Sequence, residues 1–573
     1  MTERSNGPGT PPLEASGPGK RYRRGARGSL PVAGPPPADG LPMPVPNGVR
    51  RTVVSRPPSA STAGAGRPRT TAVRGTAVPP RRSRARTRAE APARRRSGRF
   101  SVAAAPAALM LVLGLWGLDR HDSMWRDEST TYQAAHRSYG EIWHLMANAD
   151  VVHGLYYLFM HAVFGAWEGG LLTLRLPSVL AMAAAAAGVG LTGRRLAGKR
   201  VGLAAGLVFP LLPPVQQYAQ EGRSHALVCA LLVWSGVLLL GAVDRPRKRT
   251  WAGCTLLVVL ACLMHEFAVL ASAAHGAALW LARVPRATRR AWTWSACCVV
   301  LVLAPLALAS RRQGYLVDWI GFADGPHWLV YGAVSLLGGL CALAPAPAAG
   351  AMRLRVFALP LLILPKGLLL VVGFGDPLYV AGSVLCLYAG LALLIGAALE
   401  WALRVARRRG RAALTLVLAL AVSAGAATVP TALWLRTPQS RPDDTIAAAH
   451  AVRALSEPGD GVLFLPGRRR EPMLSHPWDF ARLRDLALDR GPIASGTLHG
   501  TELPASGIRA RLLSVNRVVT INDPAGQPLG DTPQERAKRA VLREHFVPCA
   551  HRDVVGMRII SYARPGKCAP RHG

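Results

Sequence analysis

Between residues 101 and 436 the chain is a succession of apolar stretches separated by short charged loops. A helix crosses the hydrocarbon core of a bilayer in about 17–25 residues, and most of these stretches have that length. The block rules out a soluble enzyme, and nine cysteines among 573 residues are too few for a disulfide framework. The sequence therefore predicts a polytopic α-helical membrane protein with about eleven spans. They are expected near 102–118, 171–192, 201–217, 225–243, 251–266, 267–282, 292–310, 326–344, 354–372, 378–401 and 412–434.

The loops between the expected spans fall into two sets by charge. One set, at 193–200, 244–250, 283–291, 345–355 and 404–411, carries 19 Lys and Arg, whereas the opposite set, at 218–224, near 266, at 311–325 and at 373–377, carries 3. Because basic loops stay in the cytoplasm, we expect the first set to be cytoplasmic. An even number of spans must then precede loop 193–200, so segment 151–166 should lie along the outer face or dip partly into it. The odd total places 437–573 outside.

The first hundred residues form an arm with a different composition. They carry 21 Lys and Arg against 4 Asp and Glu, in a chain with a net charge of +37, and show no apolar periodicity. We therefore expect residues 1–100 to be a disordered basic arm on the cytoplasmic side, which could lie on anionic membrane lipid. Nucleic acid is not an expected partner, because stacking aromatics and a folded reader are missing. The Arg-, Ala-, Gly- and Pro-rich composition favours a GC-rich bacterium and hence its plasma membrane.

The first outer loop, expected over 119–170, is crowded with ionisable side chains in its first part. Asp127 and Glu128 lie a few residues beyond the first span, at the water–lipid boundary. Such a carboxylate pair could act as a general base on an acceptor hydroxyl, or hold a divalent cation such as Mg²⁺ or Mn²⁺. It could equally be the acidic first turn of a helix that begins near Ser129.

Five segments in order carry a resemblance to a known family. They are WRDEST (125–130), HGLYYLFMHAVFG (153–165), LRLPSVLA (174–181), GRRLAGKR (193–200) and QQYAQEGRSHAL (216–227). Over about residues 102–400 the chain resembles the GT-C superfamily of glycosyltransferases. It is most similar to the bacterial branch related to protein O-mannosyltransferases, which uses polyprenyl-phosphate sugars. The resemblance implies a GT-C-like catalytic domain over 101–436, with Asp127 as the catalytic base and Glu128 as its neighbour.

The resemblance also implies a set of substrate-binding residues. The H-x-P-L-Y-Y segment of the family corresponds to His153, Tyr156 and Tyr157, and its Q-E-x-R segment corresponds to Gln220, Glu221 and Arg223. The family often has a basic residue before a late tyrosine, where this chain has Leu378 before Tyr379. Lys366 is a candidate substitute, since an intramembrane lysine is costly and functional by default. The candidate substrate-binding residues are Arg126, His153, Tyr156, Tyr157, Glu221, Arg223, His265, Lys366 and Tyr379.

These residues predict an integral-membrane glycosyltransferase. It would move a sugar of the mannose or pentose class from a polyprenyl-phosphate donor to an extracytoplasmic acceptor, which could be a glycan, a lipid or a protein of the cell envelope. A carboxylate would serve as the base, and Arg126, Arg223, Lys366 or a bound cation would hold the donor phosphate. The resemblance implies inversion at the anomeric carbon. Two alternatives remain, a polytopic transporter or lipid flippase, and a catalytically inactive scaffold of the same family.

Residues 437–573 return to a soluble composition and predict a small extracytoplasmic α/β domain. Helices are expected at 443–456, 478–489 and 532–545, and strands at 461–466, 513–521 and 557–563. Of the nine cysteines, only Cys549 and Cys568 lie in this part of the chain. Because an oxidising compartment permits disulfides, we expect these two to be bonded and to tie the chain end to the preceding helix.

Overall fold

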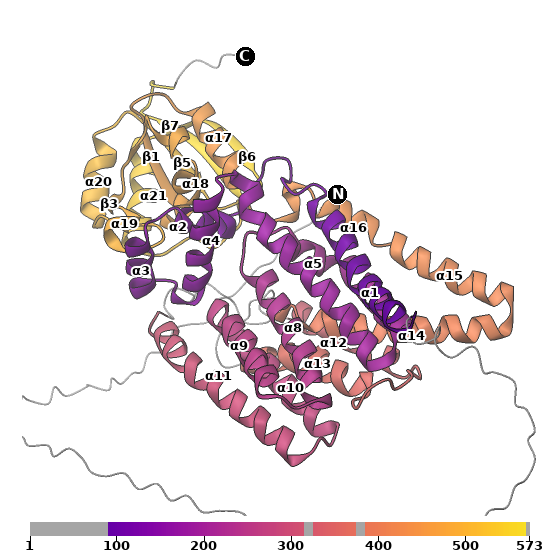
Figure 1. Cartoon of the computed structure of the whole chain (residues 1–573). Helices are drawn as coiled ribbons and strands as arrows, with labels where there is room; N and C mark the ends of the chain where they lie inside the picture. Colours follow the sequence, from indigo (N-terminus) through magenta and orange to yellow (C-terminus); the bar gives the residue numbers. More distant parts are fainter. Residues whose placement is uncertain (1–89, 314–324, 374–383, 569–573) are drawn as a thin grey trace, which may run out of the picture. The chain divides into compact units, whose positions relative to one another are not determined.

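The computed structural model describes residues 90–313, 325–373 and 384–568, which Figure 1 draws as a cartoon. In the described residues before the terminal sheet, the regular elements are helices, as the apolar stretches predict. Its helices are α1 (Glu90–Leu115), α2 (Arg126–Ala135), α3 (Tyr139–Asn148), α4 (Gly154–Ala166), α5 (Gly170–Ala197), α6 (Lys199–Val208), α7 (Pro213–Ala219), α8 (His225–Asp244), α9 (Lys248–Met264), α10 (Leu270–Leu281), α11 (Arg286–Arg312), α12 (Gly325–Ala342), α13 (Leu354–Val372), α14 (Leu387–Arg409), α15 (Arg411–Ala426) and α16 (Val429–Trp434).

Among the described residues, six helical segments are long and apolar enough to cross a membrane. Shorter apolar helices cover 101–115, 151–166 and 266–281. The segment expected to span 201–217 is divided into α6, a 3-10 turn at Phe209–Leu211 and α7, because Pro210 and Pro213 interrupt it. The total of eleven spans stays a prediction. The six segments are Gly170–Ala197, His225–Asp244, Arg286–Arg312, Leu354–Val372, Leu387–Arg409 and Arg411–Trp434.

The start of α1 corrects the expected extent of the basic arm. Residues 90–100 were expected to be disordered, whereas they form the first turns of α1. Their Ala and Arg residues favour a helix, and Pro92 is tolerated in a first turn, where its missing N–H has no helical partner. The rest of the expected arm, residues 1–89, lies outside the described residues.

Helices α2, α3 and α4 form a group with an apolar core of its own. Ser138 begins α3 with a capping box, in which the Ser138 hydroxyl accepts from the Glu141 N–H and the Glu141 carboxylate accepts from the Ser138 N–H. Segment 151–166 was not expected to span the membrane. It contains α4, which belongs to this group. Two residues from the C-terminal region, Ile446 and Leu498, pack against the same core. The α2–α4 group and the C-terminal region are therefore in direct contact.

The C-terminal region is an α/β unit with a five-stranded mixed sheet in the order β2-β1-β5-β7-β6. Strand β1 pairs in parallel with β2 and β5, and β7 pairs antiparallel with β5 and β6. The strands are β1 (Gly461–Leu465), β2 (Arg484–Asp485), β5 (Arg517–Asn522), β6 (Val547–Val554) and β7 (Met557–Ala563), with a separate hairpin of β3 (Leu488–Arg490) and β4 (Thr501–Glu502). The helices are α17 (Thr445–Leu455), α18 (Glu471–Ser475), α19 (Pro492–Ser495), α20 (Ala505–Leu513) and α21 (Pro533–His545).

Two expectations for this unit were wrong. The helix expected over 478–489 is a 3-10 turn at Pro477–Phe480 followed by β2 and the start of β3. The tertiary pairing of β2 with β1 overrides the local pattern there. Cys549 and Cys568 are joined by a disulfide with their Cα atoms 5.5 Å apart, but Cys549 lies in β6 rather than in a helix. The bond therefore ties the chain end to an edge strand.

Candidate active site

The chain turns sharply between α1 and α2. Three consecutive residues, Arg120, His121 and Asp122, have positive φ angles of 51°, 56° and 56°. This left-handed backbone costs about 1 kcal/mol or more for each non-glycine residue, so surrounding contacts must hold it in place. The turn buries the Arg120 side chain completely and directs it at α2.

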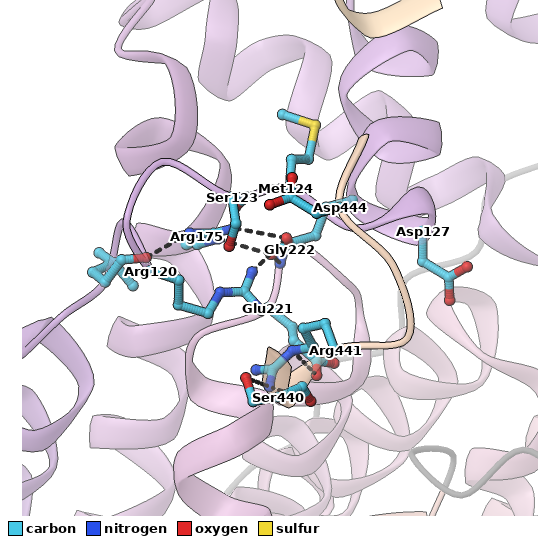
Figure 2. A network of polar contacts seen from close by, with 12 residues as sticks. Arg120, Ser123, Met124, Asp127, Arg175, Glu221, Gly222, Ser440, Arg441 and Asp444 are labelled. Carbon is cyan, nitrogen blue, oxygen red and sulfur yellow. Dashed lines mark hydrogen bonds and ion pairs between the residues drawn. The ribbon is translucent and has the colours of Figure 1, made fainter. Parts of the chain in front are cut away.

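Glu128 in α2 forms an ion pair with Arg120. Its carboxylate accepts from Arg120, from Nε and Nη2 of Arg175 at 2.8 Å each, and from the Gly222 N–H at 3.0 Å. Burial opposes ionisation of Glu128, but the Arg120 and Arg175 cations outweigh it and lower its pKa to about 2. Arg175 also donates to the Leu118 carbonyl oxygen and to that of Ser123, and Figure 2 labels Arg175 and Ser123. Glu128 is therefore an ionised anchor for the turn, with both oxygens occupied.

Asp127 has a different environment from its neighbour. Its side chain is 33% exposed, against 0% for Glu128. Figure 2 shows Asp127 pointing away from the network that contains Arg120 and Arg175. Its Oδ2 lies 3.8 Å from Nη2 of Arg223. The structure thus presents one accessible carboxylate beside one guanidinium group.

Arg223 connects this carboxylate to a second acidic residue. Nη2 of Arg223 lies 3.2 Å from Nε2 of His153, and Nδ1 of His153 contacts Oδ1 of Asp150 at 2.5 Å. Because a guanidinium group can only donate, Nε2 must accept and Nδ1 must carry the proton that points at Asp150. Burial alone would raise the pKa of Asp150, but His153 and Arg223 hold it below its usual value. The four side chains of Asp127, Arg223, His153 and Asp150 form one continuous chain of contacts.

Two more of the predicted residues surround this chain of contacts. The Tyr157 hydroxyl donates to Oδ2 of Asp150, and the Tyr157 side chain is fully buried. The ring of His265, between α9 and α10, lies edge-on to that of His153 at a centroid distance of 6.0 Å. Tyr156 is also fully buried, in the core of the α2–α4 group.

The remaining predicted residues are not part of this chain of contacts. Glu221 forms a buried ion pair with Arg441, with Nε of Arg441 and Oε1 of Glu221 3.1 Å apart. Nε of Arg126 lies 3.6 Å from Oδ2 of Asp443. Lys366 is buried within α13, and Tyr379 lies outside the described residues. Arg441 and Asp443 both belong to the segment that follows α16.

The expected alternative of a cation shared by Asp127 and Glu128 does not fit the structure. The oxygens of Glu128 already accept from two guanidinium groups and one amide. Among the described residues, no group of three or more His, Cys, Asp or Glu side chains is arranged to hold a metal ion. A cavity of about 360 Å³ lies elsewhere, lined by residues 341–348 and 353–355 and by two residues of α14.

Four residues of this site were missed by the sequence analysis: Arg120, Asp150, Arg175 and Arg441. Asp150 had a local signal, since an acidic residue three positions before His153 is well spaced to orient its ring. Arg175 lies within the quoted segment 174–181, where an arginine between apolar residues marks a buried partner. Arg441 had no local signal, because its partner, Glu221, is far away in the sequence and most of the expected spans lie between the two residues.

The comparisons with known proteins agree with the resemblance in the motifs. Residues 152–308 match the family described as dolichyl-phosphate-mannose-protein mannosyltransferase. The matched stretch includes His153, Arg223 and His265 and begins after Asp127. No curated protein matches the sequence.

Several solved structures resemble the chain at low sequence identity. ArnT from Cupriavidus metallidurans, solved with undecaprenyl phosphate, has 12% identity and a TM-score of 0.48 over 82% of this chain and 99% of its own. The oligosaccharyltransferase AglB from Archaeoglobus fulgidus has 12% identity and a TM-score of 0.42 over 83% of this chain and 75% of its own. The mycobacterial arabinofuranosyltransferase AftD has 18% identity and a TM-score of 0.42 over 82% of this chain and 42% of its own.

Proposed function

We propose that the chain transfers a sugar from a polyprenyl-phosphate donor to an acceptor hydroxyl. The proposal starts from a multi-pass membrane protein whose residues 152–308 match the family described as dolichyl-phosphate-mannose-protein mannosyltransferase. The observation that carries the proposal is the pairing of one accessible carboxylate, Asp127, with the guanidinium group of Arg223. Transfer from a lipid phosphate needs a base on the acceptor and positive charge on the leaving group. The two side chains supply both.

In this mechanism Asp127 takes the proton from the acceptor hydroxyl. The hydroxyl oxygen forms the new bond to the anomeric carbon, and the bond from that carbon to the phosphate oxygen breaks. The polyprenyl phosphate leaves with the electron pair, and Arg223 stabilises its charge through charge-assisted hydrogen bonds. A single displacement of this kind inverts the anomeric carbon, so the product carries the opposite anomeric configuration to the donor.

His153 and Asp150 act on Arg223 in this proposal. Because Nε2 of His153 accepts from Arg223, it is not available as the base. Asp150 holds the proton of His153 on Nδ1, and Tyr157 fixes Asp150 in turn. The three residues therefore orient the guanidinium group that receives the donor phosphate.

The proposed donor, acceptor and location are supported by the family match and by the charge pattern. The family description names a lipid-phosphate mannose, and we propose a donor of the mannose or pentose class. The 19-to-3 split of Lys and Arg between the two loop sets supports a site on the outer face. We accordingly propose a glycan, lipid or protein acceptor of the bacterial cell envelope, with the N-terminus cytoplasmic and residues 437–573 extracytoplasmic.

The proposal is tested with membranes that contain the full chain and with matched membranes that lack it. Each is incubated with radiolabelled polyprenyl-phosphate mannose and polyprenyl-phosphate pentoses, and label is followed into glycan, lipid and protein fractions. We expect transfer from at least one donor only in membranes with the chain. Label that crosses the bilayer on its lipid without transfer would support the flippase alternative instead.

A further inference from the structure

We propose that residues 436–445, here called the strap, position both halves of the candidate active site, and that Arg441 and Asp443 are positioning residues. The strap runs from α16 to the first residue of α17, and Ser440, Arg441 and Asp444 are drawn in Figure 2. Its role as a positioning element for catalysis rests on the proposed function. Arg441 and Asp443 each bind a different segment of the site, and Arg436 binds the helices that precede it.

The strap begins with an anchor on the helices that precede the site. Nη2 of Arg436 donates to the Leu113 carbonyl oxygen at 2.7 Å and to Oε1 of Gln216 at 3.2 Å. The guanidinium carbon of Arg436 lies 4.1 Å from the centroid of the Trp116 ring. These contacts join the start of the strap to the end of α1 and to α7, and both of these lead directly into the site.

Arg441 then holds the segment that carries Arg223. It pairs with Glu221, and its Nη2 donates to the Gln217 carbonyl oxygen at 3.2 Å. Both charged side chains are 2% exposed. Burial raises the pKa of Glu221, and Arg441 is the largest opposing influence. Without Arg441 the buried Glu221 carboxylate would lose its guanidinium partner. The backbone segment that carries the neighbouring Arg223 would then no longer be held in position.

Asp443 holds the helix that carries Asp127. Helix α2 has no side-chain cap of its own, since its N-cap residue is Trp125. The Arg126 N–H, at the first position of α2, instead donates to Oδ1 of Asp443 at 2.8 Å. The carboxylate thus satisfies an N-terminal amide and meets the positive end of the helix dipole. Thr445 adds a second contact, because its N–H donates to the Met124 carbonyl oxygen at 2.7 Å.

The other side of the strap is fixed to the α/β unit. Oδ2 of Asp443 accepts from Nη1 of Arg469, which follows β1, at 3.1 Å. Gly556, between β6 and β7, has φ +71°, and a Cβ there would lie 2.1 Å from the Pro442 carbonyl oxygen. The strap is therefore held from both sides, so it connects the terminal unit to the segments of Asp127 and Arg223. A displacement of about 1 Å at a reacting group can lower turnover by about a hundredfold.

The test uses the full chain with Asp443→Ala, which removes the cap of α2. Asp443→Asn is the conservative variant, because its amide oxygen can still accept from the Arg126 N–H. Asp531→Ala is the matched control, since Asp531 is 83% exposed and pairs only with Arg536 among the ion pairs described. Arg441→Gln tests the second contact independently. Transfer kinetics and amide hydrogen exchange by mass spectrometry are measured for each variant.

We expect Asp443→Ala to lower kcat about tenfold or more, Asp443→Asn to recover most of it, and Asp531→Ala to match the wild type. Exchange should accelerate in 124–130 for Asp443→Ala and in 216–223 for Arg441→Gln, while β1, β5 and β7 stay protected. Unchanged exchange in both segments would overturn the inference, and so would faster exchange throughout the terminal strands. The exchange measurement decides the matter even if no sugar donor is ever found, so the two proposals fail separately.

Discussion

Asp127 and Glu128 are adjacent in the chain but lie in opposite surroundings. At 3.6 residues per turn, consecutive side chains point about 100° apart, so a helix on the surface of a core buries one and exposes the other. Helix α2 buries Glu128 against Arg120 and Arg175 and leaves Asp127 a third exposed beside Arg223. We therefore propose that Asp127 carries the chemistry of the pair, whereas Glu128 holds the turn in place.

Glu128→Gln should destabilise the fold. It leaves two buried arginines without their carboxylate, a change that costs roughly 3–5 kcal/mol in a buried ion pair. Thermal unfolding in detergent measures the loss, with Glu168→Gln as the control, since the Glu168 side chain is 57% exposed. Normal unfolding of Glu128→Gln together with lost transfer would instead assign Glu128 to the chemistry.

The same variant should show a defined pH dependence. In the folded state, burial raises the pKa of Glu128, but Arg120 and Arg175 lower it by more. The net result is a fall of the pKa from the usual 4.5 to about 2. A lowered pKa stabilises the fold fully above 4.5, and this stabilisation disappears as the pH falls towards about 2. The difference in unfolding temperature between wild type and Glu128→Gln should be constant from pH 6 to 8 and shrink below about 4.5. A difference that grows in acid would contradict the assignment.

Asp150→Asn should lower turnover without unfolding the protein. The amide keeps the size of the side chain but removes the charge that holds the His153 proton on Nδ1. A hydrogen bond to a charged group contributes about 1.5–3 kcal/mol, which corresponds to a fall of about tenfold to a hundredfold. Transfer kinetics measure it against Asp489→Asn, whose exposed side chain lies in the terminal hairpin. Equal rates for the two variants would remove Asp150 from the site.

At the scale of elements, the candidate site is built on short helices and loops that rest against one another. Helix α2 carries Asp127, the turn before α4 carries Asp150 and His153, and the loop between α7 and α8 carries Arg223. None of these segments is long enough to span a membrane. The core of the α2–α4 group and the strap join them to the α/β unit.

The disulfide belongs to this scale because it joins β6 to the chain end after β7. Its residues are separated by 19 positions, and closing a loop of that size stabilises a domain by about 3 kcal/mol in the chain-entropy model. We expect reductant to lower the unfolding temperature of the terminal unit and alkylation of denatured, unreduced protein to spare both thiols. If both thiols react without reductant, the bond is absent from the protein and the case for an oxidising compartment weakens.

The six long apolar helical segments could be predicted from the sequence because apolar length alone indicates them. Strand β6 could not, because it is an edge strand whose residues are mostly exposed and show no alternation. The local motifs indicated Asp127, His153 and Arg223. The different surroundings of Asp127 and Glu128 depend on which face of α2 is buried. Residues that are distant in the sequence determine that face. Arg175 lies 47 positions from Glu128, and Arg126 lies 317 positions from Asp443.

At the scale of the whole molecule, the distribution of Lys and Arg among the loops and the packing of the α/β unit against the α2–α4 group together restrict the membrane topology. Ile446 and Leu498 pack against the core of the α2–α4 group. We therefore expect the α/β unit to lie on the same side of the membrane as that group. The basic segment 194–200 covers the last turn of α5 and the first residues of α6, and α5 is apolar enough to cross the membrane. This basic segment should therefore lie on the opposite side.

Reporter fusions test this arrangement. Fusions after Asn148 and after Gly573 should both report the outer side, and one after Gly198 should report the cytoplasm. Alkaline phosphatase and green fluorescent protein fusions give complementary signals for the two sides. If Asn148 and Gly198 report the same side, segment 151–166 or α5 is placed wrongly and the outward site loses its basis.

The central claim is that Asp127 is the base of sugar transfer, and Asp127→Asn tests it most directly. The substitution is nearly isosteric and removes the proton acceptor while leaving Arg223 to bind the donor phosphate. Donor binding and single-turnover transfer are measured on the same purified preparation, once the donor panel has identified a substrate. We predict that Asp127→Asn binds the donor within about threefold of the wild type and transfers at least about a hundredfold more slowly. Normal transfer by Asp127→Asn would contradict the account.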